Sequence, residues 1–324
     1  MRKTLSTIVF VLAALAAVLP VEPSPSPLRV AVVQFGIDES LVHSLEAFRG
    51  RIGEVVERAM AFEPDLIIFP EYTAAFTALI PYRRIVQQAD SVLQGLAGIR
   101  KEEPLAGDLR ELFLLNSGFA ERVILEIFGS LAREHSVFIL GGSYFAWERT
   151  RSGEVQLRNR AFLFGPDGSL IYSQDKVYLT GFESTLLKLS PGSSEQARAV
   201  RIKDYLVGIT ICRDTFFPAW EERLAGIDLW VDIKANGARY DEEQQEIFLR
   251  ALPARIRSSD VPFGITACLT GRFLDLFWEG ESSLVQKQGP SVRFLQRSES
   301  PGREELLIMN LGPPPRGCSG VLPE

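Results

Sequence analysis

The sequence predicts an α/β fold, and three observations predict it. Residues 28–35 and 65–69 are short apolar runs, and residues 39–61 between them repeat apolar side chains at helical spacing. This order of strand, helix and strand is typical of a crossover unit in an α/β sheet. Residues 205–211 add an apolar run rich in β-branched side chains, which indicates a buried strand.

The remaining elements follow in order along the chain. Helical periodicity predicts helices at 81–97 and 109–133, with a loop at 98–108 near the mouth of a site. A strand is expected at 137–145, and a Gly-Pro-Asp-Gly turn predicts a hairpin of strands 155–164 and 170–176. Later helices are expected at 217–225 and 241–258, the second with Asp241 as its N-cap. Later strands are expected at 200–202, 205–211, 228–234, 263–269, 283–286, 292–295 and 305–309.

The composition excludes several classes of protein. The chain has 324 residues, 46% hydrophobic and 23% charged, which is typical of a globular protein. Its formal net charge is -6, without the clustered Lys and Arg of a nucleic-acid partner. Three cysteines without CxxC spacing and two histidines exclude a disulfide scaffold, the common zinc patterns and a histidine-rich metal site. We predict no metal and no cofactor.

The N-terminus has the pattern of a targeting segment. In residues 1–20, Arg2 and Lys3 precede an apolar run of about 15 residues, shorter than the roughly 20 that span a bilayer. We expect an export signal that is cleaved, which places the protein in the periplasm or outside the cell. The alternative is an uncleaved anchor that tethers the chain to a membrane. Residues 21–27 form a Pro/Ser linker, and residues 28–324 form the one folded domain that we expect.

Cys212 follows the strand predicted at 205–211. Ligands in α/β sheets collect at the carboxyl ends of strands, so a thiol at this position is well placed to be a nucleophile. The alternative is that Cys212 is a small buried hydrophobic residue, because free cysteines are among the most buried residue types.

Glu71 and Lys176 end apolar strands in the same way. A carboxylate can accept the thiol proton, and an ammonium can lower the pKa of the thiol and stabilise an oxyanion. The three side chains together predict nucleophilic catalysis. Taken singly, Glu71 could be a solvated strand end and Lys176 a charge on an edge strand.

The segments PDLIIFPEY, FLFGPDGSLIYSQDKVYL and GITICRDTFFPAWEERLAGIDLWV resemble, in order and spacing, three signature blocks of the nitrilase superfamily of carbon–nitrogen hydrolases. The resemblance covers about residues 28–311. It implies a four-layer αββα sandwich and a homodimer or larger assembly. It also implies a triad in which Glu71 is the general base, Lys176 the oxyanion-stabilising cation and Cys212 the nucleophile, with the backbone N–H of Arg213 as a second oxyanion donor.

The chain departs from the family pattern at the second glutamate. Members of the family usually carry it a few residues into the strand that begins here near Gly141, where this chain has Phe145. Glu148, three residues later, is expected to serve instead. The alternative is that Glu148 is a solvated strand end beside Arg149.

Four other positions carry expectations of their own. Arg213 replaces an aromatic or aliphatic residue and could depress the pKa of Cys212 or bind a substrate carboxylate. Asp214 could orient Lys176 or neighbouring backbone. Asn236 aligns with a segment that lines the acyl pocket of the family, or is a turn residue before a glycine. Cys268 either packs inside its strand or forms a disulfide with Cys318.

Three functions compete on this evidence. The first is an exported hydrolase that cleaves a small-molecule amide through a thioester on Cys212. The second is an N-acyltransferase at a membrane face, because a branch of the superfamily uses the same acyl-enzyme to acylate lipoproteins. That branch carries several transmembrane helices and this chain has at most one. The third is a non-catalytic binding domain on the same fold, in which Cys212 would be inert.

Overall fold

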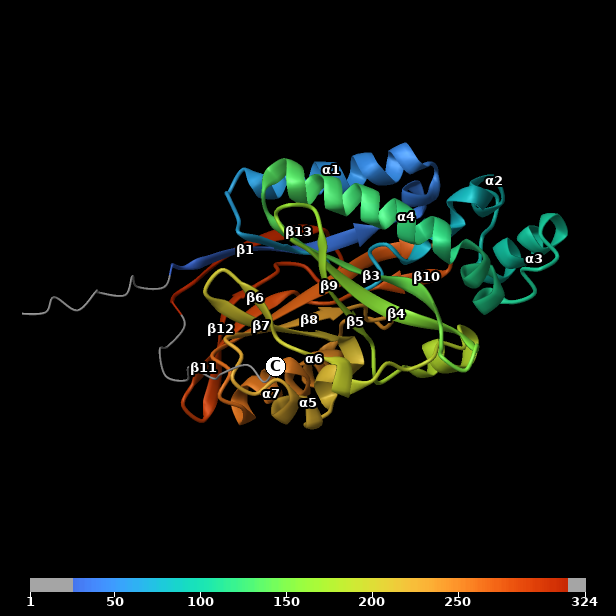
Figure 1. The fold of residues 1–324 in the computed structure, drawn as a ribbon. Coiled ribbons are helices and arrows are strands. Elements are labelled where there is room, and N and C mark those ends of the chain that lie inside the picture. Colours follow the sequence, from blue (N-terminus) through green and yellow to red (C-terminus); the bar gives the residue numbers. More distant parts are fainter. Residues whose placement is uncertain (1–25, 314–324) are drawn as a thin grey trace, which may run out of the picture.

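The computed structural model describes residues 26–313 (Figure 1). The expected export signal, most of the Pro/Ser linker and Cys318, with its expected disulfide to Cys268, lie outside the described residues. Within residues 26–313, none of the helices has the length and the apolar composition needed to cross a membrane.

Helices lie between consecutive strands in residues 28–149 and 205–273, and the other strands follow one another without an α-helix between them. The strands are β1 (Leu28–Ile37), β2 (Leu66–Ile68), β3 (Phe138–Arg149), β4 (Val155–Phe164), β5 (Leu170–Asp175), β6 (Val200–Ile202), β7 (Tyr205–Ile211), β8 (Leu229–Lys234), β9 (Phe263–Phe273), β10 (Leu276–Trp278), β11 (Ser283–Gln288), β12 (Ser291–Arg297) and β13 (Glu305–Leu311). The helices are α1 (Leu45–Met60), α2 (Arg83–Val86), α3 (Val92–Glu102), α4 (Leu109–His135), α5 (Ala219–Arg223), α6 (Glu242–Arg250) and α7 (Leu252–Ser258).

The strands form one continuous sheet in the order β5-β4-β3-β2-β1-β9-β8-β7-β6, with β10 to β13 paired at the sides of this path. Its two halves meet where the end of β1, residues 35–37, pairs in parallel with residues 269–271 of β9. Strands β1, β2 and β3 are parallel in one half, and β7, β8 and β9 are parallel in the other. The carboxyl ends of β2 and β7, which precede Glu71 and Cys212, therefore belong to parallel arrays.

Three separate apolar cores show that the two halves of the sheet lie face to face between helices. The first core packs α1 and α4 against one half, through residues such as Phe48, Phe128 and Phe69. The second lies between the inner faces of the two halves and includes Val30 and Ile209. The third packs α5 and α7 against the other half. Figure 1 shows α1 and α4 on one side of the strands and α5, α6 and α7 on the other. The four-layer αββα sandwich is therefore confirmed.

Two helices that periodicity predicts as continuous are interrupted. The expected helix at 81–97 is wrong as a single element: Pro81 lies in a 3₁₀ turn, α2 ends at Val86, and α3 begins after its N-cap Ser91. The expected helix at 241–258 starts as predicted, because the Asp241 side chain accepts a hydrogen bond from the Gln244 backbone. It then breaks into α6 and α7, and a proline stands in the first turn of α7.

A close backbone approach fixes the turn that carries Glu71. Gly142, in an irregular step of β3, has a φ of +82°, and a Cβ placed there would lie 2.1 Å from the carbonyl oxygen of Pro70. Only glycine accommodates both the left-handed backbone and the contact. Pro70 immediately precedes Glu71, so the small size of Gly142 sets the position of the carboxylate.

We predict that Gly142→Ala lowers the free energy of unfolding by about 2 kcal/mol or more, because it adds a steric clash to left-handed strain. Gly153→Ala is the matched control: Gly153 has a φ of +88°, and a Cβ added there would meet no atom within 4 Å, so only the strain of about 1 kcal/mol applies. Urea unfolding measures both. Equal losses in the two variants would contradict the importance of the contact with Pro70.

Candidate active site

The predicted residues follow three strand ends, where Glu71 and Lys176 are buried and Cys212 is half-buried. Glu71 follows β2, Lys176 directly follows β5, and Cys212 directly follows β7. The Lys176 Nζ lies 2.8 Å from the Glu71 Oε1, and both side chains are about 1% exposed. The Glu71 Oε2 accepts a hydrogen bond of 2.8 Å from the Ala235 backbone. Neither Glu71 nor Lys176 is therefore a solvated strand end or a charge on an exposed edge.

A second carboxylate, which the sequence pattern did not single out, shares the same lysine. The Lys176 Nζ lies 2.8 Å from the Glu183 Oε2, and the Glu183 side chain is fully buried. The Asn159 Nδ2 donates to the Oε1 atoms of both glutamates, at 2.8 Å and 2.9 Å. One ammonium thus lies between two carboxylates, and one amide group bridges them.

Glu183 is held in turn by its own neighbours. The Tyr72 hydroxyl donates to its Oε1 at 2.7 Å, and the Thr180 backbone donates to its Oε2 at 2.9 Å. The Glu183 backbone donates to the Thr180 Oγ1 at 3.2 Å, which completes a capping box at the start of a short π-helical turn over residues 182–186. The Thr-Gly-Phe-Glu pattern is the sequence signal that could have drawn attention to Glu183.

The structure does not bring Glu148 to Lys176. Glu148 lies near the end of β3, where it is 44% exposed and pairs with Arg160 at 3.0 Å and with Arg158 at 3.6 Å. The position beside Lys176 is occupied by Glu183 instead. The expectation for Glu148 is therefore corrected: its carboxylate belongs to a partly exposed arginine cluster.

The backbone of Cys212 is strained, and side chains of β8 hold it by hydrogen bonds. Cys212 has a φ of +53°, in the left-handed region that side chains other than glycine rarely adopt. Its backbone N–H donates to the Asp232 Oδ1 at 2.9 Å, and its carbonyl accepts from the Lys234 Nζ at 3.1 Å. Asp232 and Lys234 are buried and form an ion pair at 2.9 Å. This pair, together with the Thr215 hydroxyl on Asp232, holds the turn that presents the thiol.

Burial and nearby charges set the protonation states. Burial, together with the charge of Glu71, raises the pKa of Cys212 to about 12, although Lys176 and Lys234 act in the opposite direction. Burial also raises the pKa of Glu71, against the effect of Lys176 and with the help of Glu183. Burial opposes the charge of Lys176, but Glu71 and the other anionic neighbours raise its pKa above the ordinary value. The resting site therefore holds a neutral thiol and an ammonium, and Glu71 is a stronger base than an ordinary glutamate.

The remaining predicted residues surround Cys212 in other roles. The cations that lower the pKa of its thiol are Lys176 and Lys234, whereas Arg213 is exposed and its Nη1 donates to the Leu179 carbonyl at 3.0 Å. Asp214 is buried and accepts from the backbone of the two residues directly after Lys176, so it positions that segment. Burial raises the pKa of Asp214 to about 7, against these hydrogen bonds.

A cleft lies in front of these groups. Its part beside Cys212 and Arg213 has a volume of about 500 Å³. An adjoining part beside Lys176 and Tyr72 has a volume of about 430 Å³, and Asn236 lines both. The Asn236 Nδ2 also donates to the carbonyls of Ala238 and Glu279. Asn236 therefore lies at the site and braces the loop that lines it.

Among residues 26–313, no group of three or more His, Cys, Asp or Glu side chains is arranged to hold a metal ion. The chemistry that the residues of the cleft can perform is that of an activated thiol. A carboxylate can accept a proton, an ammonium can stabilise an oxyanion, and a strained turn presents the sulfur to a cleft.

The fold and the cleft are those of a hydrolase of the nitrilase type, and the comparison with protein families identifies the family. The family model of carbon-nitrogen hydrolases matches residues 29–221. This match covers more than half of the chain, so the chain belongs to the carbon–nitrogen hydrolase family. No curated protein matches the chain.

Solved structures share the fold at low sequence identity. A mutant of the Nesterenkonia AN1 amidase from the nitrilase superfamily is 19% identical, with a TM-score of 0.61, over 89% of this chain and 93% of the amidase. A carbon-nitrogen hydrolase from Helicobacter pylori G27 is 17% identical, with a TM-score of 0.62, over 88% of each chain. Another Nesterenkonia amidase mutant, 18% identical with a TM-score of 0.61 over 88% of this chain and 93% of its own, carries acrylamide added at its active site cysteine.

We predict that Asp232 and Lys234, the buried ion pair on β8, shift the pKa of the Cys212 thiol in opposite directions. Lys234→Met removes a positive charge, raises the pKa of Cys212 further and slows its alkylation by iodoacetamide at a fixed, mildly alkaline pH. Asp232→Asn removes a negative charge and accelerates alkylation. The rate changes about tenfold when the pKa changes by one. Peptide mass spectrometry of the Cys212 peptide measures the rate.

The double variant Asp232→Asn/Lys234→Met is the control, because it removes both charges and leaves no unpaired buried ion. Its alkylation rate is expected to lie between those of the single variants. If both single variants changed the rate in the same direction, the charge of the pair would not control the thiol.

Proposed function

We propose that this enzyme hydrolyses non-peptide amide bonds of small molecules through a thioester on Cys212. The observation that carries the proposal is the buried Lys176 between two carboxylates, at a cleft that the strained Cys212 also lines. Membership of the carbon–nitrogen hydrolase family supports the reaction class. The acrylamide adduct on the active site cysteine of the Nesterenkonia amidase is consistent with a thiol nucleophile on this fold.

In the acylation step, Glu71 accepts the proton of the Cys212 thiol as the sulfur attacks the amide carbonyl carbon. The new S–C bond converts the carbonyl into a tetrahedral oxyanion, which Lys176 and the backbone N–H of Arg213 stabilise. The C–N bond then breaks, and Glu71 returns the proton to the leaving amine. The products of this step are the free amine and the thioester on Cys212.

In the deacylation step, water attacks the thioester carbonyl and gives its proton to Glu71. The same donors stabilise the second oxyanion. The C–S bond breaks, the carboxylic acid leaves, and the Cys212 sulfur recovers its proton from Glu71. Protons and electron pairs therefore balance over the cycle, with one water consumed.

The raised pKa of Cys212 favours this general-base route over a preformed thiolate. A thiol with a pKa of about 12 is neutral in the resting enzyme, so its proton must leave as the sulfur attacks. Glu71 suits that task because its own pKa is raised, which makes it a stronger base than an ordinary carboxylate. Glu183 would serve as a positioning residue that keeps Lys176 charged and in place.

The acyltransferase alternative uses the same first half of the reaction. It differs only in the acceptor, which is an amine in place of water. Export through residues 1–20, with or without a retained membrane tether, would place either reaction outside the cytoplasm. We further propose that the enzyme forms a homodimer or a larger assembly.

We predict that Cys212→Ala lowers amide turnover by roughly four orders of magnitude or more, because it removes the nucleophile. The same variant is expected to lose the mass gain that intact-protein mass spectrometry detects on the wild type after incubation with a pool of amides. Cys268→Ala, which changes the other described cysteine, is the matched control and keeps both signals.

Decay of the adduct in water alone supports the hydrolase, and decay only after an amine is added supports the acyltransferase. Undiminished turnover in folded Cys212→Ala protein would contradict a mechanism through this thiol. Circular dichroism checks that each variant is folded.

We predict that kcat/KM falls as the pH falls through the pKa of Glu71, because a protonated carboxyl group cannot accept the thiol proton. Burial raises this pKa, so the acid limb lies above the ordinary glutamate value of about 4.3. Initial rates with one amide across the pH range measure it. An acid limb at or below the ordinary value would show that Glu71 is not the group whose protonation stops the reaction.

A further inference from the structure

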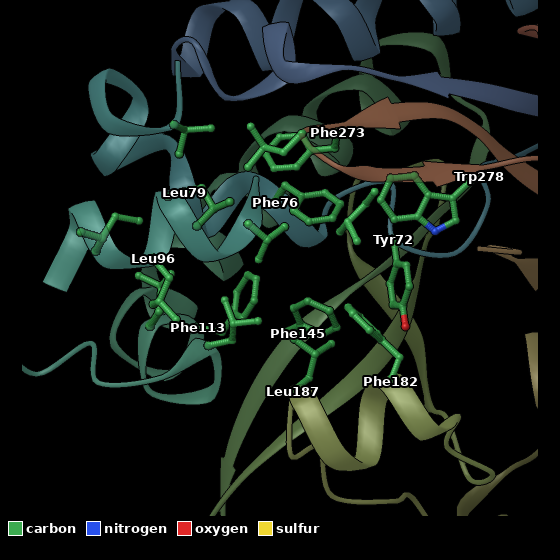
Figure 2. Close-up of a pocket in the computed structure, with 18 residues that line it drawn as sticks. Tyr72, Phe76, Leu79, Leu96, Phe113, Phe145, Phe182, Leu187, Phe273 and Trp278 are labelled. Carbon is green, nitrogen blue, oxygen red and sulfur yellow. The ribbon is translucent and has the colours of Figure 1, made fainter. Parts of the chain in front are cut away.

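An apolar cavity lies beside the active-site cleft (Figure 2). It has a volume of about 50 Å³. Its walls come from residues 76–113, from Phe145 on β3, from residues 273–278 at the end of β9 and in β10, and from the turn at 182–187. The segment between β2 and α4 that contains α2 and α3 therefore supplies much of a preformed space.

The lining gives this cavity a preference for hydrocarbon. Of the described residues that line it, only Tyr72 and Trp278 have a polar side-chain atom, and the Tyr72 hydroxyl is already bonded to Glu183 at 2.7 Å. The other lining residues are aliphatic, aromatic or glycine. Apolar cavities of this kind stay dry and accept apolar groups, because water would find few hydrogen-bond partners in them.

The cavity continues into the cleft. Four residues, Tyr72, Phe182, Leu276 and Trp278, line both the cavity and the part of the cleft beside Lys176. In Figure 2, Tyr72, Phe182 and Trp278 lie toward one end of the cavity, and Leu79 and Leu96 toward the other. Tyr72 directly follows Glu71 in the chain, so the polar end of the cavity begins at the reacting groups.

We propose that this cavity holds the acyl chain of the substrate and that the substrate is an unbranched aliphatic amide. This inference rests on the proposed thioester mechanism. The amine must leave and water must enter while the acyl group stays bound to Cys212. The part of the cleft beside Cys212 is bordered by the exposed Arg213, so the amine can leave and water can enter through it. The apolar cavity suits the acyl group, which stays bound. Its small volume favours a slim alkyl chain over a bulky ring.

The test measures binding separately from turnover. Full-length Cys212→Ala protein is titrated calorimetrically with butyramide, hexanamide and octanamide, which it binds without cleaving. If the chain enters the cavity, affinity rises roughly fourfold for each methylene that is buried. Because a cavity of about 50 Å³ holds only about two methylenes, the gain is expected from butyramide to hexanamide and not from hexanamide to octanamide. N-pentylacetamide, which carries the alkyl chain of hexanamide on the amine side, is expected to gain no such advantage over N-methylacetamide.

Gly95→Leu in the same background tests the cavity itself. A Cβ at Gly95 meets only Ala89 at 3.6 Å and Leu274 at 3.9 Å, so a leucine can be built there and fills the space. It is expected to remove the gain from butyramide to hexanamide. Gly50→Leu, at an exposed helical glycine where an added Cβ would meet no atom within 4 Å, is the matched control and keeps the gain. Leu96→Ala enlarges the cavity and should extend the gain to longer amides.

Equal affinities along the amide series, or a gain that persists in folded Gly95→Leu protein, would overturn the proposal. A chain-length gain on the amine side in place of the acyl side would overturn it as well. If Gly95→Leu does not fold, an unchanged chain-length preference in Leu96→Ala protein counts against the cavity. Wild-type turnover separates the two proposals: chain-dependent binding without hydrolysis of any amide would refute the proposed function and leave the cavity assignment standing.

Discussion

The structure of the site depends on one buried lysine that faces two carboxylates. Lys176 lies between Glu71 and Glu183, and all three side chains are buried. Taking such charges out of water is costly, and a buried ion pair is weak evidence for stability in itself. The arrangement instead sets protonation: the ammonium of Lys176 remains charged, and burial, with a smaller contribution from Glu183, raises the pKa of Glu71.

The same reasoning explains why the thiol is protonated at rest. An ammonium near a sulfur would favour the thiolate, as the sequence pattern suggested. In the folded protein, burial and the charge of Glu71 outweigh Lys176 and Lys234, so the pKa of Cys212 rises. The enzyme thereby avoids a permanently reactive thiolate, and Asp232 and Lys234 act on Cys212 in two ways: their charges shift the pKa of the thiol in opposite directions, and their hydrogen bonds hold the backbone that presents it.

The sequence predicted the parts of the site that lie at the ends of regular strands. Glu71, Lys176 and Cys212 follow apolar runs that form buried strands, and the face-to-face packing of the two halves of the sheet brings the ends of these strands together. Glu183 could not be placed in this way, because it lies in an irregular turn whose path depends on its contacts with Thr180 and Tyr72. Glu148 stood at a plausible spacing along β3, but spacing does not give the partner on the next strand, which is an arginine cluster.

The bounds of most strands were predicted to within a few residues. The bounds of the helices were predicted less well. Periodicity identifies a face that is buried, but it does not reveal a break inside the segment. The breaks at 87–91 and at Ala251 matter because they change what the helices can line. After the first break, the Val92 backbone donates to the Asp275 side chain directly before β10, and Val92 and Leu96 line the apolar cavity together with Leu276. An uninterrupted helix over 81–97 would place Val92 and Leu96 differently, so the interruption that periodicity missed determines which residues line the cavity.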